Sequence, residues 1–246
     1  MKQNHQLRNA IIWIVIYVVA MSVGESLNKQ IGVQSAATAA IALALSVGLC
    51  VYLRRVNGWR ENGFVAVDGK RMAKALYCLP LIVLATVNLW RGAVLRFSPL
   101  ETALYVLAML CVGFIEESVF RGLLFRAMLK DGVKSAVLVS SLTFGLGHIV
   151  NLLNGAELLP TLLQLAYAVA IGLALSVFVL RTGNIIPCVV FHGVFNAMST
   201  FSNEAGLTDG YRIATSAIIV VISVGYAAYL WRRLPAAETE ATEANA

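Results

Sequence analysis

The chain has 246 residues, of which 59% are hydrophobic and only 13% are charged, and its mean hydropathy is +0.77. About a quarter of the residues of soluble globular domains are charged, so the composition excludes a soluble enzyme and predicts a polytopic membrane protein. The formal net charge of +6 does not indicate nucleic-acid binding, because the lysines and arginines lie in short gaps between apolar runs, where they set membrane topology.

Eight apolar runs predict one all-α domain, a bundle of about eight transmembrane helices that spans residues 1–235. The first run is short enough for the apolar part of a signal peptide, but no convincing cleavage site follows it, and we expect an uncleaved first helix. The acidic tail 236–246 is expected to be disordered. The predicted helices cover residues 10–27, 36–53, 75–90, 100–120, 133–153, 158–180, 185–201 and 213–231.

The basic residues predict the orientation of this bundle. With the N-terminus inside the cell, 15 of the 19 lysines and arginines fall on the cytoplasmic side. The opposite side keeps only Lys29, Arg91, Arg96 and Arg212. Cytoplasmic loops of membrane proteins carry an excess of basic residues, so we expect a multi-pass protein of the cell membrane with both termini in the cytoplasm.

Two adjacent carboxylates and an arginine interrupt the fourth run. In a helix, Glu117 and Arg121 stand four residues apart with the acid first, which favours an ion pair, while Glu116 points about 100° away. Glu117 and Arg121 can therefore form a structural pair that leaves Glu116 free for water, a metal or a substrate. The alternatives are a plain ion pair at the membrane interface and a Glu116 side chain that reaches the cytoplasmic interface.

Two histidines lie inside later runs, each in a four-residue spacing. Phe144 and His148 share one helix face, and His192 and Asn196 share another. Ionisable groups at the centre of a spanning helix cost roughly 2.5 to 3.5 kcal/mol and normally face the bundle interior. Each histidine alone is also typical of a helix–helix hydrogen bond, and Phe144 is typical of packing. Together with Glu116, the histidines indicate one functional site that three helices form.

The chain resembles the CPBP family of intramembrane proteases, which includes the type II CAAX prenyl endopeptidases (Rce1-like) and bacteriocin-processing or immunity-associated (Abi) proteins. The resemblance covers residues 100–200, which would form the catalytic core. It rests on three motifs in the family's order, Glu116-Glu117-x-x-x-Arg121, Phe144-x-x-x-His148 and His192-x-x-x-Asn196.

This resemblance implies a peptide-bond hydrolase with an eight-helix core and a cavity that opens towards the cytoplasmic face. The residues at the attacking water would be Glu116, which activates it, and His148, His192 and Asn196, which surround it. Structural support would come from Glu117, Arg121 and Phe144.

Two mechanisms stay open on the residues alone. Glu116, His148 and His192 provide the carboxylate and two imidazoles that suffice for a catalytic zinc with an open water position, although the chain has no His-Glu-x-x-His helix. Without a metal, Glu116 would act as general base, while His192 and Asn196 donate hydrogen bonds to the oxyanion of the tetrahedral intermediate. We favour the glutamate base.

The leading hypothesis is an intramembrane endopeptidase that cuts a membrane-associated protein or peptide near its cytoplasmic C-terminal end. Prenylated CAAX proteins are the best-known substrates of the family, the lipid bilayer is the other expected partner, and no nucleic acid is expected. The first alternative is a proton- or metal-coupled transporter that uses the same groups as a relay, but the sequence shows no transporter-like repeat. The second is a membrane scaffold or immunity factor without catalysis.

Overall fold

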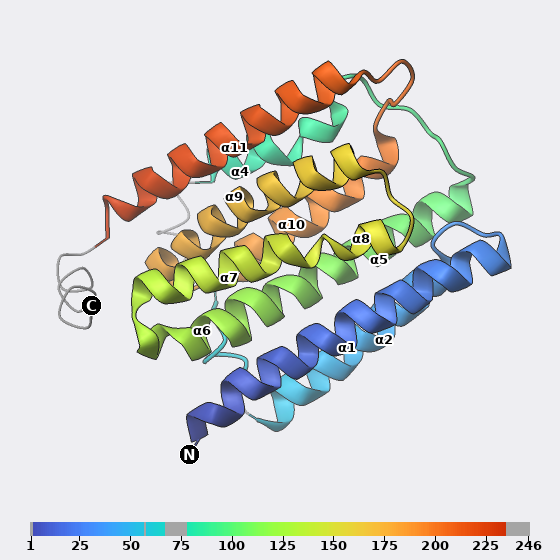
Figure 1. Ribbon diagram of the computed structural model, residues 1–246. Coiled ribbons are helices and arrows are strands. Elements are labelled where there is room, and N and C mark those ends of the chain that lie inside the picture. The colour runs from blue at the N-terminus through green and yellow to red at the C-terminus, as the bar shows by residue number, and fades with distance from the viewer. Residues whose placement is uncertain (1, 57, 67–77, 235–246) are drawn as a thin grey trace.

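The computed structural model of the protein describes residues 2–56, 58–66 and 78–234. All the regular elements in these ranges are helices, which lie side by side in one bundle (Figure 1). Extended residues pair only once within the described ranges, in an isolated antiparallel bridge between Ala93 and Ser202. The predicted all-α polytopic membrane bundle is confirmed.

The elements include α-helices and short helices of other types, labelled η. All the η elements are 3-10 helices except η3, which is a π-helix. In chain order they are α1 (Lys2–Ile31), α2 (Ala36–Arg55), α4 (Leu79–Ala85), η2 (Val87–Leu89), α5 (Pro99–Glu117), η3 (Ser118–Leu124), α6 (Phe125–Met128), η4 (Leu129–Asp131), α7 (Val133–Gly147), α8 (Val150–Leu153), α9 (Leu158–Thr182), α10 (Ile186–Met198), η5 (Ser199–Phe201) and α11 (Asp209–Trp231).

Eight apolar helical segments of the described chain correspond to the eight predicted spans. Two of them, Leu79–Leu89 and Ile186–Phe201, are shorter than a full membrane crossing. The start of the predicted third span at 75–77 and the predicted acidic tail 236–246 lie outside the described residues. The six segments that are long and apolar enough to cross a membrane are His5–Ile31, Ala36–Arg55, Pro99–Asp131, Val133–Leu153, Leu158–Thr182 and Asp209–Trp231.

The helical run that carries the two glutamates is longer than predicted. It begins at Pro99, after a capping box in which Ser98 and Glu101 exchange hydrogen bonds, and it continues through η3 and α6 to Asp131. The predicted end near Phe120 is therefore wrong. The charges of the motif suggested a helix end, but Arg121 is fully buried and paired inside the bundle, so the helix continues past it.

The fifth predicted span is divided into two helices. α7 ends at Gly147, and a turn at His148 and Ile149 leads into α8. His148 therefore caps α7 instead of lying inside a continuous helix. It still follows Phe144 by one turn, so the two side chains remain neighbours.

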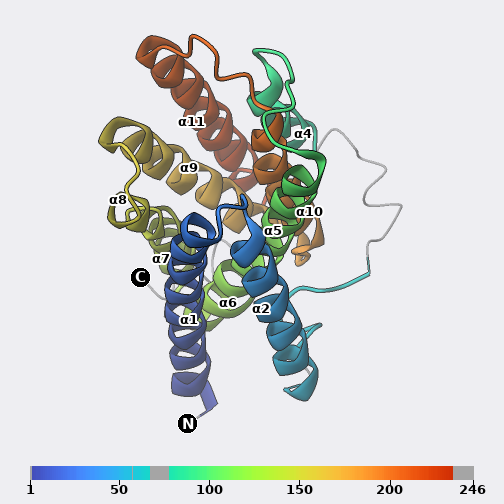
Figure 2. The ribbon, with the colours of Figure 1, turned by 90° about the vertical axis from the view of Figure 1, so that its right-hand side faces the viewer.

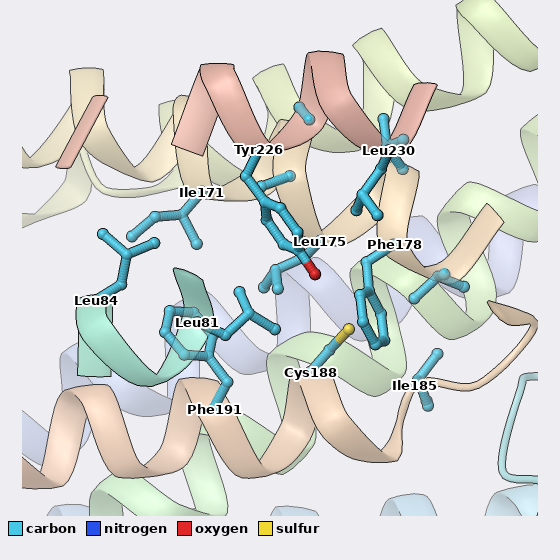
Figure 3. Close-up of a cluster of buried hydrophobic side chains, with 14 of the residues drawn as sticks. Leu81, Leu84, Ile171, Leu175, Phe178, Ile185, Cys188, Phe191, Tyr226 and Leu230 are labelled. Carbon is cyan, nitrogen blue, oxygen red and sulfur yellow. The ribbon is translucent and has the colours of Figure 1, made fainter. Parts of the chain in front are cut away.

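The core consists of two apolar clusters. The first surrounds α9, whose residues between 168 and 179 are mostly buried, and it includes Cys188 of α10 and Tyr226 of α11 (Figure 3). The second joins α1, α2 and α5 and includes Leu49 and Ile115. Because α5 also packs against α10, the two clusters meet along the helices that carry Glu116 and His192.

The bundle has two ends with different loops (Figures 1 and 2). At the end that we call the terminal end, α1 begins, α11 finishes at Trp231, and the loop 58–66 follows α2. At the far end lie four connections, residues 32–35, 90–98, 154–157 and 202–208.

Candidate active site

Glu117 is the buried centre of a charge network. Its Oε1 accepts hydrogen bonds from Arg121 Nη1 and from His192 Nδ1, each at 2.8 Å. Both members of the i,i+4 pair expected from the sequence, Glu117 and Arg121, are fully buried. A buried ion pair needs further hydrogen bonds to offset its lost hydration, and His192 supplies one. Because a carboxylate only accepts, Nδ1 of His192 carries a hydrogen.

Glu116 points away from Glu117 and has different neighbours. Its Oε1 accepts a hydrogen bond of 2.6 Å from the Tyr17 hydroxyl of α1. Its Oε2 lies 3.2 Å from His192 Nε2, within ion-pair distance, but without the geometry of a hydrogen bond to any described residue. His192 therefore lies between the two glutamates, with one ring nitrogen towards each. The contact with Glu116 is favourable when one proton lies between the two atoms, because two facing lone pairs repel.

Phe144 connects the arginine with both histidines. The guanidinium carbon of Arg121 lies 4.2 Å from the centroid of the Phe144 ring. The His148 and His192 rings meet the same ring edge to face, at centroid distances of 5.3 and 5.4 Å. His148 Nδ1 lies 3.1 Å from the Phe144 carbonyl oxygen, which only accepts. Nδ1 of His148 therefore donates, and a neutral His148 keeps a free lone pair on Nε2.

The π-helix η3 begins directly after the glutamates. A π-helix is rare, and its wide turn occurs most often at functional sites. Within η3, the Phe120 carbonyl accepts a hydrogen bond of 2.9 Å from Ser140 Oγ of α7. This bond ties the motif of the fourth predicted span to the helix that carries Phe144.

Glycines allow α5 and α10 to approach each other closely at the site. A methyl group on Gly113 would lie 2.5 Å from the backbone nitrogen of Gly193, so a larger residue cannot replace Gly113 without a shift of the helices. Gly193 follows His192, and the close contact therefore sets the position of that histidine next to α5. Gly145 similarly packs against α9, whereas Gly147 faces open space.

One cavity of about 320 Å³ adjoins these groups. Its wall includes Glu116, His148 and Asn196, together with Phe144 and Tyr17. His192 is buried behind Glu116 and does not belong to the lining. Further polar residues of the wall are Glu25, Asn88, Tyr105, Asn151, Gln164, Tyr167 and Ser199.

The cavity extends from Glu116 towards the far end of the bundle. Its lining runs from Ile14 to Glu25 on α1 and from Glu116 back to Tyr105 on α5, and both directions lead away from the terminal end. On the terminal side, the loop 58–66 packs against η3. The cavity lining thus runs towards the end of the bundle opposite to the terminal end, whereas the expected cytoplasmic termini and the expected cavity towards the cytoplasmic face would lie at the same end.

The three residues considered for a metal do not form a metal site in this arrangement. Among the described residues, no three side chains of His, Cys, Asp or Glu are placed so that they could hold one ion. Glu116 and His192 face each other directly, and the second nitrogen of His192 is bonded to Glu117. The donor set of Glu116, His148 and His192 thus does not fit a zinc ion here.

Tyr17 is a neighbour of Glu116 that the sequence did not predict. Tyr and Trp residues commonly anchor spanning helices at the membrane interfaces, so a tyrosine near an apolar run does not by itself indicate a functional site. A signal was nevertheless present, because Tyr17 stands well inside the first apolar run, where a hydroxyl group needs a hydrogen-bond partner from another helix.

The comparison with protein families matches the site segment. A family model described as type II CAAX prenyl endopeptidase Rce1-like matches residues 98–198, which run from the cap of α5 to the end of α10 and contain all three motifs. No curated protein and no solved structure matches the chain. Residues 98–198 therefore form an Rce1-like domain of the type II CAAX prenyl endopeptidase family.

Proposed function

We propose that the protein is an intramembrane endopeptidase in which Glu116 activates a water molecule in the cavity that it shares with His148 and Asn196. The family is one of membrane-embedded proteases, which supports hydrolysis of a membrane-associated protein or peptide. The observation that carries the residue roles is that these three side chains, from three separate parts of the bundle, line one cavity. Its volume of about 320 Å³ is that of a small ligand pocket.

In the proposed reaction, Glu116 takes a proton from the water as the water oxygen attacks the carbonyl carbon of the scissile peptide bond. The carbonyl oxygen becomes an oxyanion and accepts a hydrogen bond from the side-chain amide of Asn196; His148 adds a second one from Nε2 in its imidazolium form, since Nδ1 already donates to the Phe144 carbonyl oxygen. The C–N bond then breaks while Glu116 returns the proton to the nitrogen of the leaving peptide. Each step uses groups that line the cavity.

His192 has a different role in this scheme from the oxyanion donor expected from the sequence. Both of its ring nitrogens face glutamates, and its side chain does not line the cavity. We assign it the positioning of Glu116 and the sharing of the catalytic proton. Glu117 and Arg121 hold His192 in turn, through the hydrogen bonds at Glu117 Oε1.

The proposed orientation places both termini in the cytoplasm, in agreement with the basic residues at the terminal end. Arg54, Arg55, Arg232 and Arg233 lie there, whereas the far end carries Glu25, Glu101, Glu157, Glu204 and Asp209. Membrane insertion favours the end with more lysines and arginines in the cytoplasm, and the far end has fewer of them, namely Lys29, Arg91, Arg96 and Arg212. The cavity would then extend towards the non-cytoplasmic face, and the substrate would be a peptide that is reached from that face or from within the bilayer.

The experiment compares the termini of membrane peptides, by mass spectrometry, in cells that express the wild-type protein or Glu116→Gln. Glutamine keeps the shape of the side chain but cannot take a proton, so cleavage is expected to fall by about 100-fold or more. Glu157→Gln is the matched control, because this glutamate is exposed before α9 and does not line the cavity. Identical termini in wild-type and Glu116→Gln cells, with both proteins folded in the membrane, would refute the proposal.

The cleaved peptide then allows a metal test with the purified protein. Because the donor residues do not gather at one point, activity is expected to survive a strong chelator. Loss of activity that returns when zinc is added would overturn the glutamate-base mechanism.

A further inference from the structure

A second pocket, of about 220 Å³, lies at the far end of the bundle, beside the cavity that contains Glu116. Its walls are formed by η2, the connections 90–98 and 202–208, the N-terminal parts of α9 and α11, and Phe195 of α10. Asn88, Tyr167 and Phe195 line both this pocket and the catalytic cavity. The two pockets therefore adjoin each other at these shared side chains.

Two arginines give this pocket an excess of positive charge. Arg91 donates from Nη2 to the Ala205 carbonyl oxygen at 2.6 Å, and its guanidinium lies 5.0 Å from the centroid of the Tyr211 ring. Arg212 makes no ion pair and no side-chain hydrogen bond with any described residue. The Nε atoms of both arginines are buried without a hydrogen-bond partner among the described residues.

The acidic residue among the described lining does not neutralise the arginines. Glu204 is bound instead to Arg96, with an Nη1–Oε1 distance of 2.6 Å. Guanidinium groups recognise carboxylates and phosphates through paired hydrogen bonds, and buried donors without a partner are costly. The pocket thus has unused donors and net positive charge, which together suit an oxyanion.

Hydrogen bonds join the segments that form the walls of the pocket. Val94 N donates to Phe201 O at 2.9 Å next to the bridge between Ala93 and Ser202, and Arg96 Nη2 donates to Ser199 O at 2.8 Å. The connections that carry Arg91 and Glu204 are therefore held together rather than free to separate. A preformed pocket loses less entropy when it binds a ligand.

We propose that Arg91 and Arg212 bind the C-terminal carboxylate of the peptide that is cut in the adjoining cavity. This inference rests on the proposed endopeptidase function, because the shared wall of Asn88, Tyr167 and Phe195 would then separate the bound carboxylate from the bond to be cut. The alternative source of an oxyanion, a phospholipid headgroup, has no comparable reason to lie beside Glu116.

The test measures binding, so that it does not depend on cleavage. A fluorescent peptide that ends in a prenylated CAAX sequence is titrated into Glu116→Gln protein in nanodiscs of zwitterionic lipid, once with a free C-terminal carboxylate and once with a C-terminal amide. The free acid is expected to bind about tenfold more tightly, because the amide cannot form charge-assisted hydrogen bonds with the arginines. Arg212→Gln should remove this difference and leave binding of the amide unchanged.

Arg212→Gln is the decisive variant, because the Arg212 side chain makes no hydrogen bond with any described residue that the substitution could break. Arg232→Gln, at the opposite end of α11, is the matched control and should keep the preference for the acid. Equal binding of acid and amide, no measurable binding of either, or an equal loss of both in Arg212→Gln would overturn the proposal. The proposal would also be overturned if the preference for the free acid disappeared in nanodiscs that contain anionic phospholipid. Tight binding of the acid without cleavage by the wild-type protein would instead contradict the endopeptidase function alone.

Discussion

At the scale of single residues, two neighbouring glutamates have different surroundings because they point to different sides of one helix. Glu117 is fully buried and bonded to Arg121 and His192, whereas Glu116 borders the cavity and is bonded to Tyr17. The spacing of the motif predicts the first pair, because residues four apart on a helix are neighbours. It contains no information on Tyr17, which lies 99 residues away in the chain.

Replacement of Tyr17 by phenylalanine is expected to lower the rate of peptide cleavage by about tenfold, because Glu116 loses a hydrogen bond that orients its carboxylate. The rate is measured with the purified protein and its identified peptide. Tyr52→Phe serves as the control, since it removes a tyrosine hydroxyl that bonds Asn9 between α1 and α2 and does not line the cavity. A Tyr17→Phe enzyme as fast as the wild type would show that this hydrogen bond does not serve catalysis.

At the scale of elements, the site depends on how closely α5 and α10 pack. Gly113 and Gly193 are in backbone contact at their crossing, one turn before the glutamates and next to His192. The following π-helix, η3, accepts a hydrogen bond at the Phe120 carbonyl from Ser140 Oγ of α7. The sequence shows the glycines but not which of them meet, because the crossing point depends on the relative shift of two helices.

Gly113→Ala is expected to destabilise the fold by about 1 to 3 kcal/mol, because the added methyl group pushes α10 away from α5. Cleavage should fall together with stability, since His192 moves with α10. The measurement is the thermal unfolding temperature in detergent, alongside cleavage of the identified peptide. Gly225→Ala on α11 has no neighbour within 4 Å of the added carbon and should not lower the unfolding temperature. If both variants unfold at the same temperature as the wild type, the close crossing is not needed for stability.

At the scale of the whole molecule, the basic residues and the cavity lie towards opposite ends of the bundle. The basic residues gather at the terminal end, while the cavity extends to the far end, where acidic side chains are more frequent. With the terminal end in the cytoplasm, the active site would be reached from the other face of the membrane. The family resemblance, in contrast, implies a cavity towards the cytoplasmic face.

Single cysteines in a variant without Cys50, Cys78, Cys111 and Cys188 test this orientation. A membrane-impermeant maleimide added to intact cells is expected to label Glu157→Cys in the far-end connection and Gln164→Cys in the cavity. Glu61→Cys, in the loop at the terminal end, should react only after the membrane is permeabilised. Labelling of the Gln164 position from the same side as the Glu61 position would contradict the proposed access route.

Composition and local spacing were sufficient for the fold class, for the eight apolar segments, for the family and for the Glu117–Arg121 pair, since each of these depends on residues close together in the chain. Packing between distant helices decided the rest. It placed His192 between two glutamates, brought Tyr17 to Glu116, and gave the cavity its direction. These features depend on which faces of separate helices meet and on the relative shift of the helices along their axes. Apolar runs in a membrane carry little information about the contacting faces or about the shift.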